Sequence, residues 1–329
     1  MLTKRGKITS NKRDDDRMKT ALVTGGAGFI GSHLVDRLIN DGWRVKVIDN
    51  MTCGRTDNLA HHIKNKNLQF VQGDLADAVS VSKMVQDCNT IFHLAAHANI
   101  QRSMKDHKVD LQNNLICTIN ILDAMIANSV NDLVFASTSA VYGEATVKPT
   151  PESYAPLQIS LYGASKLACE AYTEAYTQFS PINFWAFRFS NVIGERLRRN
   201  VIWDFVHKLM VNPKELEILG DGKQSREYLY VKDCVDAIML GYEKASERVN
   251  IFNLGLDTQT TVDGVADIVI EEMKLSNVKR KYTGGPRGWI GDTPLVILDN
   301  TKIKNTGWKP KCASEEAIRR TVRWTLENS

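Results

Sequence analysis

Short apolar runs alternate with longer amphipathic stretches from residue 19 to about residue 189. The apolar runs are rich in β-branched and aromatic residues and predict buried strands at 20–24, 45–49, 68–73, 90–95, 132–136 and 183–188. The stretches between them have helical spacing and cover 28–41, 79–86, 109–128 and 161–178. This alternation predicts an α/β fold, in which helices cover both faces of a doubly wound parallel sheet.

The alternation ends after residue 189. Turn signals such as Asn212-Pro213, Gly220-Asp221-Gly222 and Gly284-Gly285-Pro286 separate shorter elements, and an amphipathic helix at about 314–326 closes the chain. We therefore expect a sheet domain at 19–189 and a smaller C-terminal substrate-binding lobe at 190–329, with segments that return to the sheet domain. Residues 1–18 lack the apolar core of a signal peptide and are expected to be a disordered tail.

Composition narrows the classes of partner. The 42 basic and 38 acidic residues nearly balance, which argues against a surface for nucleic acid or for a membrane. No apolar stretch approaches the roughly 20 residues of a membrane span. The six cysteines form no C-x-x-C pair, so we expect no metal site and no disulfide framework, but reduced thiols in the cytoplasm.

A glycine-rich segment, Thr24-Gly25-Gly26-Ala27-Gly28-Phe29-Ile30-Gly31, follows the first predicted strand and opens a helix. Gly26 and Gly28 allow a tight turn close to a pyrophosphate, and Gly31 allows the helix to pack closely on the strand. Asp49 ends the second strand, where a carboxylate can accept the ribose hydroxyls of NAD and repel the 2′-phosphate of NADP. The context predicts a Rossmann domain that binds NAD, while Arg55 leaves NADP as the alternative.

A second set of residues suggests proton chemistry. Tyr162 and Lys166 are four residues apart in a predicted helix, so they share one helical face. An adjacent ammonium group favours the phenolate form of a tyrosine, which could then accept a proton from a hydroxyl group. Thr138 follows the fifth strand and could bind the same oxygen. The alternative is a surface tyrosine beside a solvated lysine.

These motifs together resemble the extended short-chain dehydrogenase/reductase family, in particular its nucleotide-sugar epimerases and dehydratases. The resemblance runs from residue 19 to about residue 323. It rests on 24–31, Asp49, Gly73-Asp74-Leu75, His93-Leu94-Ala95-Ala96, Asn114, Val141-Tyr142-Gly143, 162–166, Arg188-Phe189-Ser190-Asn191-Val192 and Arg226-Glu227-Tyr228.

The resemblance implies roles for individual residues and an assembly. Thr138, Tyr162 and Lys166 are the implied catalytic residues. The implied NAD contacts are Gly25, Gly28, Phe29, Ile30, Gly31, Asp49, Asn50, Asp74, Leu75, Leu94, Ala95, Ala96, Asn113, Tyr162 and Lys166. Substrate contacts are implied for Thr138, Asn191, Arg226 and Asp292, with Asn191 and Arg226 on the diphosphate. A homodimer is implied through the helices at 109–128 and 161–178.

The residues after Thr138 narrow the reaction. Family dehydratases carry Asp-Glu there, and related decarboxylases carry a Glu before Val-Tyr-Gly, whereas this chain has Ser139 and Ala140. Neither residue can act as a carboxylic acid, which argues against elimination of water. The resemblance then implies C4 epimerisation of a UDP-linked sugar through a 4-keto intermediate. Val296 stands where family epimerases carry a bulky aromatic, so N-acetylhexosamine and uronate forms remain open beside glucose and galactose.

Other polar and aromatic residues keep alternative interpretations. Arg196, Arg198 and Arg199 could include one substrate ligand or form a solvated surface. His93 and His97 are expected to be packed rather than catalytic, and Trp289 to pack rather than stack on a base. A non-catalytic NAD sensor, an RNA-binding protein and an oxidoreductase that releases NADH remain alternative functions.

Overall fold

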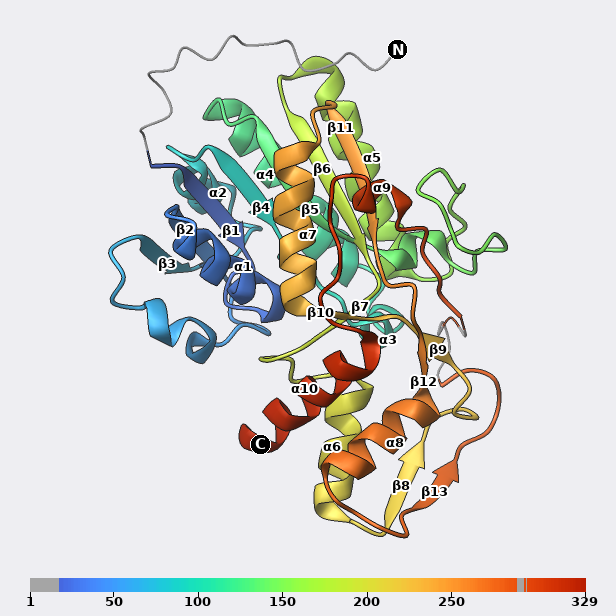
Figure 1. Ribbon diagram of the computed structural model, residues 1–329. Coiled ribbons are helices and arrows are strands. Elements are labelled where there is room, and N and C mark those ends of the chain that lie inside the picture. The colour runs from blue at the N-terminus through green and yellow to red at the C-terminus, as the bar shows by residue number, and fades with distance from the viewer. Residues whose placement is uncertain (1–17, 289–292, 294) are drawn as a thin grey trace. The chain divides into compact units, whose positions relative to one another are not determined.

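The computed structural model describes residues 18–288, 293 and 295–329 (Figure 1). Except for Met18, the tail expected at 1–18 lies outside the described residues. The chain divides into two compact units, which are described separately below. The sheet unit combines 1–141, 161–188 and 238–252, and the second unit combines 142–160, 189–237 and 253–329. The boundary expected at residue 189 stays a prediction.

A seven-stranded sheet forms the centre of the sheet unit, in the order β11-β6-β5-β4-β1-β2-β3. Its strands are β1 (Thr20–Thr24), β2 (Arg44–Asp49), β3 (Leu68–Gln72), β4 (Thr90–His93), β5 (Asp132–Thr138), β6 (Asn183–Phe189) and β11 (Val249–Leu254). The pairs β1·β2, β2·β3, β1·β4 and β4·β5 are parallel. The six predicted strands and the Rossmann-type fold are therefore confirmed, and β11 is the strand supplied by the second half of the chain.

Alternate residues of each strand face opposite sides of the sheet. On one side, Ile91, Phe135 and Phe184 join a core with the helices α2 (Ala78–Val85), α4 (Cys117–Ala127) and α5 (Leu161–Phe179). On the other side, the rings of Phe92 and Trp185 both meet Tyr242, which lies near the end of α7 (Val231–Lys244). Tyr242 belongs to the part of α7 that lies in the sheet unit, and α1 (Phe29–Asn40) follows β1.

The helix predicted at 109–128 differs in its first turns. Residues Leu111–Ile116 form a π-helix, η2, and the α-helix α4 begins only at Cys117. The wider turn places Asn114 in the interior, where its side chain bonds to groups of two other segments. A π-turn of this kind is frequent at functional sites.

Short elements complete the sheet unit. They are the 3₁₀ helix η1 (Thr56–His62), the helix α3 (Ile100–Ser103) and a 3₁₀ turn, η3 (Ser139–Tyr142), that follows β5. The six cysteines of the chain are free thiols, and all except Cys53 are buried. Over the described part of the chain, no helix is both long and apolar enough to span a membrane.

The second unit contains more helix than its turn signals predict. Its helices are α6 (Val201–Val211), α8 (Val262–Glu272), α9 (Thr301–Lys304) and α10 (Ser314–Glu327). Its strands pair two by two: β7 (Asn191–Ile193) with β10 (Tyr228–Tyr230), β8 (Glu215–Ile218) with β13 (Lys279–Tyr282), and β9 (Ser225–Arg226) with β12 (Thr260–Thr261). Asn200 and Thr261 cap α6 and α8, because their side chains accept hydrogen bonds from the first N–H groups of these helices. The predicted final helix is confirmed.

Candidate cofactor and catalytic site

The carboxyl ends of β1, β2, β3, β4 and β5 carry most of the predicted site residues. Because these strands are parallel, their carboxyl ends lie along one edge of the sheet. The register sets Thr24 opposite Ile48 and His93, and Asp49 opposite Gln72. Thr138 is the last residue of β5, and Asp74 and Leu75 follow β3. The fold thus gathers the residues predicted for NAD within the sheet unit.

The turn from β1 to α1 leaves no room for larger residues. Gly25 has a φ of +68°, and a Cβ on Gly31 would lie 2.2 Å from the carbonyl oxygen of Gly25. The N–H of Gly28 donates to that same carbonyl at 3.0 Å. Gly28 precedes α1 and offers no side chain to its first N–H groups, Phe29 and Ile30 among them. This cradle fits a pyrophosphate, which such N–H groups and the positive end of the helix dipole attract.

Acidic side chains stand beside this turn. Asp49 Oδ2 accepts a hydrogen bond from the N–H of Ala27 at 3.1 Å, and Oδ1 accepts one from Met51 at 2.9 Å. Burial raises the pKa of Asp49, and these backbone bonds oppose the rise. Asn50 Nδ2 approaches Asp74 Oδ2 at 3.4 Å, while Asp74 Oδ1 accepts from Ala76. Both carboxylates thus lie beside the glycine-rich turn, and their contacts with the ribose and the adenine of NAD stay predictions.

A buried histidine connects the glycine-rich turn to the neighbouring helices. Thr24 Oγ1 accepts the N–H groups of Leu94 at 3.2 Å and Ala95 at 3.1 Å, so its own hydrogen points to His93 Nδ1, 2.7 Å away. His93 Nε2 then carries the ring hydrogen and donates to Thr118 Oγ1 at 3.1 Å. Burial, and next the charge of Lys166, lower the pKa of His93 to about 3. His93 is therefore neutral and of one tautomer.

Asn114 extends these contacts to the helix that carries Tyr162. Thr118 donates its hydroxyl to the carbonyl oxygen of Asn114 at 2.7 Å. Asn114 Nδ2 donates to Ser165 Oγ at 2.8 Å, and Ser165 donates to the carbonyl oxygen of Tyr162 at 2.8 Å. The adjacent Asn113 instead bonds to the carbonyl of Val109 on its own turn. Hydrogen bonds thus connect the glycine-rich turn with the first turn of α5.

Lys166 lies in the interior, directly against β5. Its ammonium nitrogen is 3.8 Å from the centre of the Phe135 ring, and the residue is only 2% exposed. Burial lowers the pKa of Lys166 to about 8, although Cys169 and Glu170 act in the opposite sense. Tyr162 lies one helical turn earlier, on the same face of α5. A lysine that loses its proton near neutral pH can influence the protonation of this tyrosine.

A buried ion pair fixes α5 against the end of β5. Arg188 on β6 donates to Glu170 through Nη2 at 2.6 Å and through Nε at 3.1 Å. Ser137 Oγ donates to the same carboxylate, and Ser137 immediately precedes Thr138. Thr138 Oγ1 accepts the N–H of Ala140 at 3.1 Å, and η3 begins with Ser139. The helix that carries Tyr162 and Lys166 and the strand that ends in Thr138 are therefore joined by charge-assisted hydrogen bonds.

Of the predicted substrate residues, Thr138 lies in the sheet unit, whereas Asn191 and Arg226 belong to the second unit. Asn191 begins β7 and pairs in register with Tyr228 of β10, two residues after Arg226. Arg226 donates to the carbonyl of Ser225 at 2.8 Å and pairs with Thr260. Arg198 lies over the Trp324 ring, at 5.2 Å from its centre. Asp292 and Trp289 lie outside the described residues, and Val296 is half-buried.

Several residues that support the site were not singled out from sequence. They include Thr118, Ser165 and Glu170, whose side chains bond to His93, Asn114 and Arg188. Asn58 donates to the carbonyl of Ala27 in the glycine-rich turn at 2.9 Å. Glu170 follows Lys166 by four residues, and this spacing could have indicated a shared helical face. Asn58 gives no comparable signal, because it lies in the short 3₁₀ helix η1 and belongs to none of the motifs.

Comparison with known proteins identifies the family. Residues 21–255 match the NAD dependent epimerase/dehydratase family. The chain is 35% identical to a putative UDP-glucose 4-epimerase of Methanocaldococcus jannaschii, over 94% of this chain and 99% of the relative.

Solved structures agree with this match. A UDP-glucose 4-epimerase of Thermotoga maritima in complex with UDP-glucose is 34% identical, with a TM-score of 0.85 over 94% of this chain and 99% of that chain. A dTDP-glucose 4,6-dehydratase of Streptomyces venezuelae with bound NAD is 28% identical, with a TM-score of 0.87 over 94% and 97% of the two chains. Family, fold and cofactor cradle agree, and the chain belongs to the NAD-dependent epimerase/dehydratase family.

Proposed function

We propose that this enzyme inverts the C4 hydroxyl of a UDP-linked hexose, with UDP-glucose and UDP-galactose as the first substrates to test. One observation carries the proposal: β5 ends in Thr138 beside the helix of Tyr162 and Lys166, and Ser139 and Ala140 follow it. Elimination of water needs a proton donor near the leaving hydroxyl group, and neither side chain is an acid. Epimerisation needs only the base and the oxidised cofactor.

In the proposed reaction, Tyr162 as phenolate removes the proton of the C4 hydroxyl, and Thr138 donates a hydrogen bond to the same oxygen. Bound NAD supplies the chemistry of hydride acceptance and return at C4. The ammonium group of Lys166 favours the phenolate, because an adjacent positive charge stabilises the ionised form. After the 4-keto sugar has turned its other face, Tyr162 returns the proton and the inverted alcohol forms.

The cofactor assignment follows the cradle of the sheet unit. The turn from Gly25 to Gly31 would hold the pyrophosphate, with the N–H groups of Phe29 and Ile30. Asp49 and Asn50 would hold the adenosine ribose, and Asp74 and Leu75 the adenine. Leu94, Ala95, Ala96 and Asn113 would line the path toward the nicotinamide, beside Tyr162 and Lys166. Apart from Asn113 in η2 and Tyr162 and Lys166 in α5, these residues lie at or after the carboxyl ends of the parallel strands β1 to β4, as dinucleotide contacts do in this kind of sheet.

For the substrate, we propose that Asn191 and Arg226 bind the diphosphate, with Asp292 as a further contact. A guanidinium group matches phosphate oxygens in charge and in geometry. The relative from M. jannaschii and the T. maritima structure, by their names, favour a UDP-linked glucose or galactose. Val296 in place of a bulky aromatic keeps UDP-N-acetylhexosamine and UDP-uronate as further substrates to test.

The test is incubation of the purified enzyme, with and without added NAD, with UDP-glucose, UDP-N-acetylglucosamine and UDP-glucuronate, followed by proton NMR of the anomeric region. A galacto-configured product without net NADH formation is the expected result. A 4-keto product that accumulates would instead identify a dehydratase and overturn the argument from Ser139 and Ala140.

The matched variant is Tyr162→Phe, which removes one oxygen atom and leaves the helix intact. It is expected to lose turnover and to retain NAD. Retained turnover would exclude Tyr162 as the base. Absence of turnover with every sugar in the wild-type enzyme, despite bound NAD, would favour the non-catalytic alternatives.

A further inference from the structure

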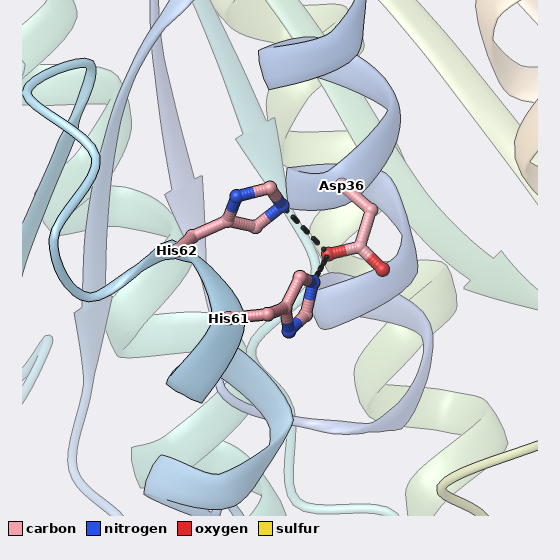
Figure 2. A group of neighbouring side chains, drawn as sticks. All are labelled: Asp36, His61 and His62. Carbon is pink, nitrogen blue, oxygen red and sulfur yellow. Dashed lines mark hydrogen bonds and ion pairs between the residues drawn. The ribbon is translucent and has the colours of Figure 1, made fainter.

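Three side chains with metal-binding atoms converge where η1 ends beside α1 (Figure 2). His61 Nε2 lies 2.7 Å from Asp36 Oδ1, and His62 Nε2 lies 3.2 Å from the same oxygen. One ligand atom from each residue lies within 4.8 Å of the other two. Among the described residues, no other group of three His, Cys, Asp or Glu side chains meets this condition.

The two histidines are neighbours in sequence and yet direct the same ring atom to one point. Adjacent residues of a 3₁₀ helix point about 120° apart, so their side chains usually diverge. Here the two rings lie with their centres 4.1 Å apart and an angle of 44° between their planes. Figure 2 shows both Nε2 atoms facing one oxygen of Asp36, while the second oxygen points away from the rings.

Charge at this place favours a cation. With neutral imidazoles, the three side chains together carry one negative charge. The arginines nearest in sequence contact other carboxylates: Arg37 pairs with Asp41 at 2.7 Å, and Arg55 with Asp57 at 2.9 Å. His61 is about half exposed on its side chain, at 47%, whereas His62 is 12% exposed, so an ion can enter from solvent to partly buried ligands.

We propose that Asp36, His61 and His62 form a binding site for a divalent transition-metal ion of the zinc type. Two imidazole nitrogens and one carboxylate oxygen are ligands that Zn²⁺ and its neighbours in the first transition row accept, whereas Mg²⁺ and Ca²⁺ require oxygen ligands. Each ring binds the ion through Nε2 as the neutral tautomer that carries its hydrogen on Nδ1, and water completes the coordination. In the structure, His61 Nε2 and Asp36 Oδ1 form a hydrogen bond, and His62 Nε2 lies at ion-pair distance from the same oxygen.

The site joins two elements that support the cofactor turn. The N–H of Arg55 donates to the carbonyl of Ala27 at 3.0 Å, and Asn58 Nδ2 donates to it at 2.9 Å. Both residues lie at η1, and Ala27 precedes α1, which carries Asp36. An ion that cross-links η1 to α1 therefore stabilises the folded sheet unit by binding the native state only. Its role is structural, and the proposal does not depend on which sugar the enzyme converts.

The experiment uses the full chain without an affinity tag, after removal of metal with a chelator. Zn²⁺ is titrated by calorimetry, Co²⁺ is followed by its visible absorption, and Mg²⁺ serves as the negative probe. We expect one Zn²⁺ per chain, Co²⁺ bands that Zn²⁺ abolishes, and a higher melting temperature with Zn²⁺. Asp36→Asn, His61→Gln and His62→Gln should each weaken binding about tenfold or more.

His107→Gln is the matched control, because His107 is an exposed histidine of the same unit. This substitution is expected to leave Zn²⁺ binding unchanged. Melting curves without metal show whether each variant is folded. Binding of Zn²⁺ that survives in the folded His61→Gln, His62→Gln double variant, or that is lost equally in His107→Gln, would overturn the proposal. So would a wild-type protein that binds less than one Zn²⁺ per chain.

Discussion

At the scale of single residues, two buried nitrogen-containing side chains meet the ring of Phe135. The Lys166 ammonium nitrogen is 3.8 Å from the ring centre, and the His93 ring is 5.6 Å from it, centre to centre. Burial lowers the pKa of both groups, of His93 to about 3 and of Lys166 to about 8. Near neutral pH the interior therefore holds a charge on Lys166 but none on His93, so the two side chains do not repel each other.

The buried charge of Lys166 costs stability, and removal of that charge should show it. A fall in pKa from 10.5 to about 8 corresponds to roughly 3 kcal/mol. Lys166→Met removes this cost but also removes the contact of the ammonium group with the Phe135 ring. We therefore expect the variant to raise the free energy of unfolding at pH 7 by about 2 kcal/mol. We also expect it to abolish turnover. The destabilisation by the charged Lys166 is complete below pH 8. It disappears as the pH rises from 8 to 10.5, because Lys166 loses its proton at a lower pH in the folded than in the unfolded wild type. Urea unfolding at pH 7 and pH 10.5 checks this, and an equal difference at both values would contradict it.

His93 should make the protein sensitive to acid. The unfolded chain binds a proton at His93 near pH 6.5, whereas the folded chain does not until about pH 3. Stability therefore falls as the pH falls from 6.5 toward 3. His93→Gln keeps one donor and one acceptor and removes the titration. We expect this variant to lose about 2 kcal/mol less than the wild type between pH 7 and pH 5. Denaturant unfolding at both values is the measurement, with His107→Gln as control; unchanged acid sensitivity in His93→Gln would exclude this role.

At the scale of secondary-structure elements, the pair of Glu170 and Arg188 joins α5 to β6 and, through Ser137, to β5. Both charges are buried, at 2% and 7% exposure of their side chains. Loss of one partner leaves the other as an unpaired buried charge, which costs about 3–5 kcal/mol. Glu170→Gln is expected to destabilise the protein by an amount near this range and to reduce turnover, because Thr138 and Lys166 lose their common anchor.

The exposed pair of Arg37 and Asp41 is the matched control for this prediction. Asp41→Asn should change the free energy of unfolding by no more than about 0.5 kcal/mol. The double variant Glu170→Leu, Arg188→Met removes both charges and should be more stable than Glu170→Gln. Chemical denaturation of the three variants decides the point, and a Glu170→Gln variant as stable as Asp41→Asn would contradict it.

The sequence predicts elements well where one physical signal dominates. β1 has the predicted limits, because its five residues are all buried and are bounded by polar Lys19 and by Gly25. The π-turn at Leu111–Ile116 was not predicted, because an apolar spacing that fits a helix does not distinguish its hydrogen-bond pattern. Likewise, the glycine-rich turn and the pair Tyr162–Lys166 were recognised from sequence. The contacts of Thr118 and Asn114 depend on residues far apart in the chain, and no local pattern reports them.

At the scale of the whole molecule, exposed apolar side chains on η2, α4 and α5 favour the formation of a homodimer. Ile116, Ile126, Tyr172 and Phe179 are between 42% and 70% exposed there. Exposed apolar side chains gathered on neighbouring helices are typical of an interface. We expect a homodimer through these helices, and the double variant Tyr172→Glu, Phe179→Glu to be monomeric. Light scattering after gel filtration is the measurement. Val79 is an exposed apolar residue of α2, and the control variant Val79→Glu should remain dimeric. A wild-type protein that is monomeric would contradict the prediction.

The sheet unit closes late in synthesis, because its edge strand β11 begins at Val249, 60 residues after β6 ends at Phe189. A growing chain has therefore already made Tyr162 and Lys166 while β6, with Phe184, Trp185 and Phe187, still lacks its outer neighbour. At ribosomal rates of about 5–20 residues per second, this apolar edge stays open for roughly 3–12 s. An unpaired strand edge can pair with another chain. For nascent chains on one messenger, these seconds are the interval in which aggregation competes with folding.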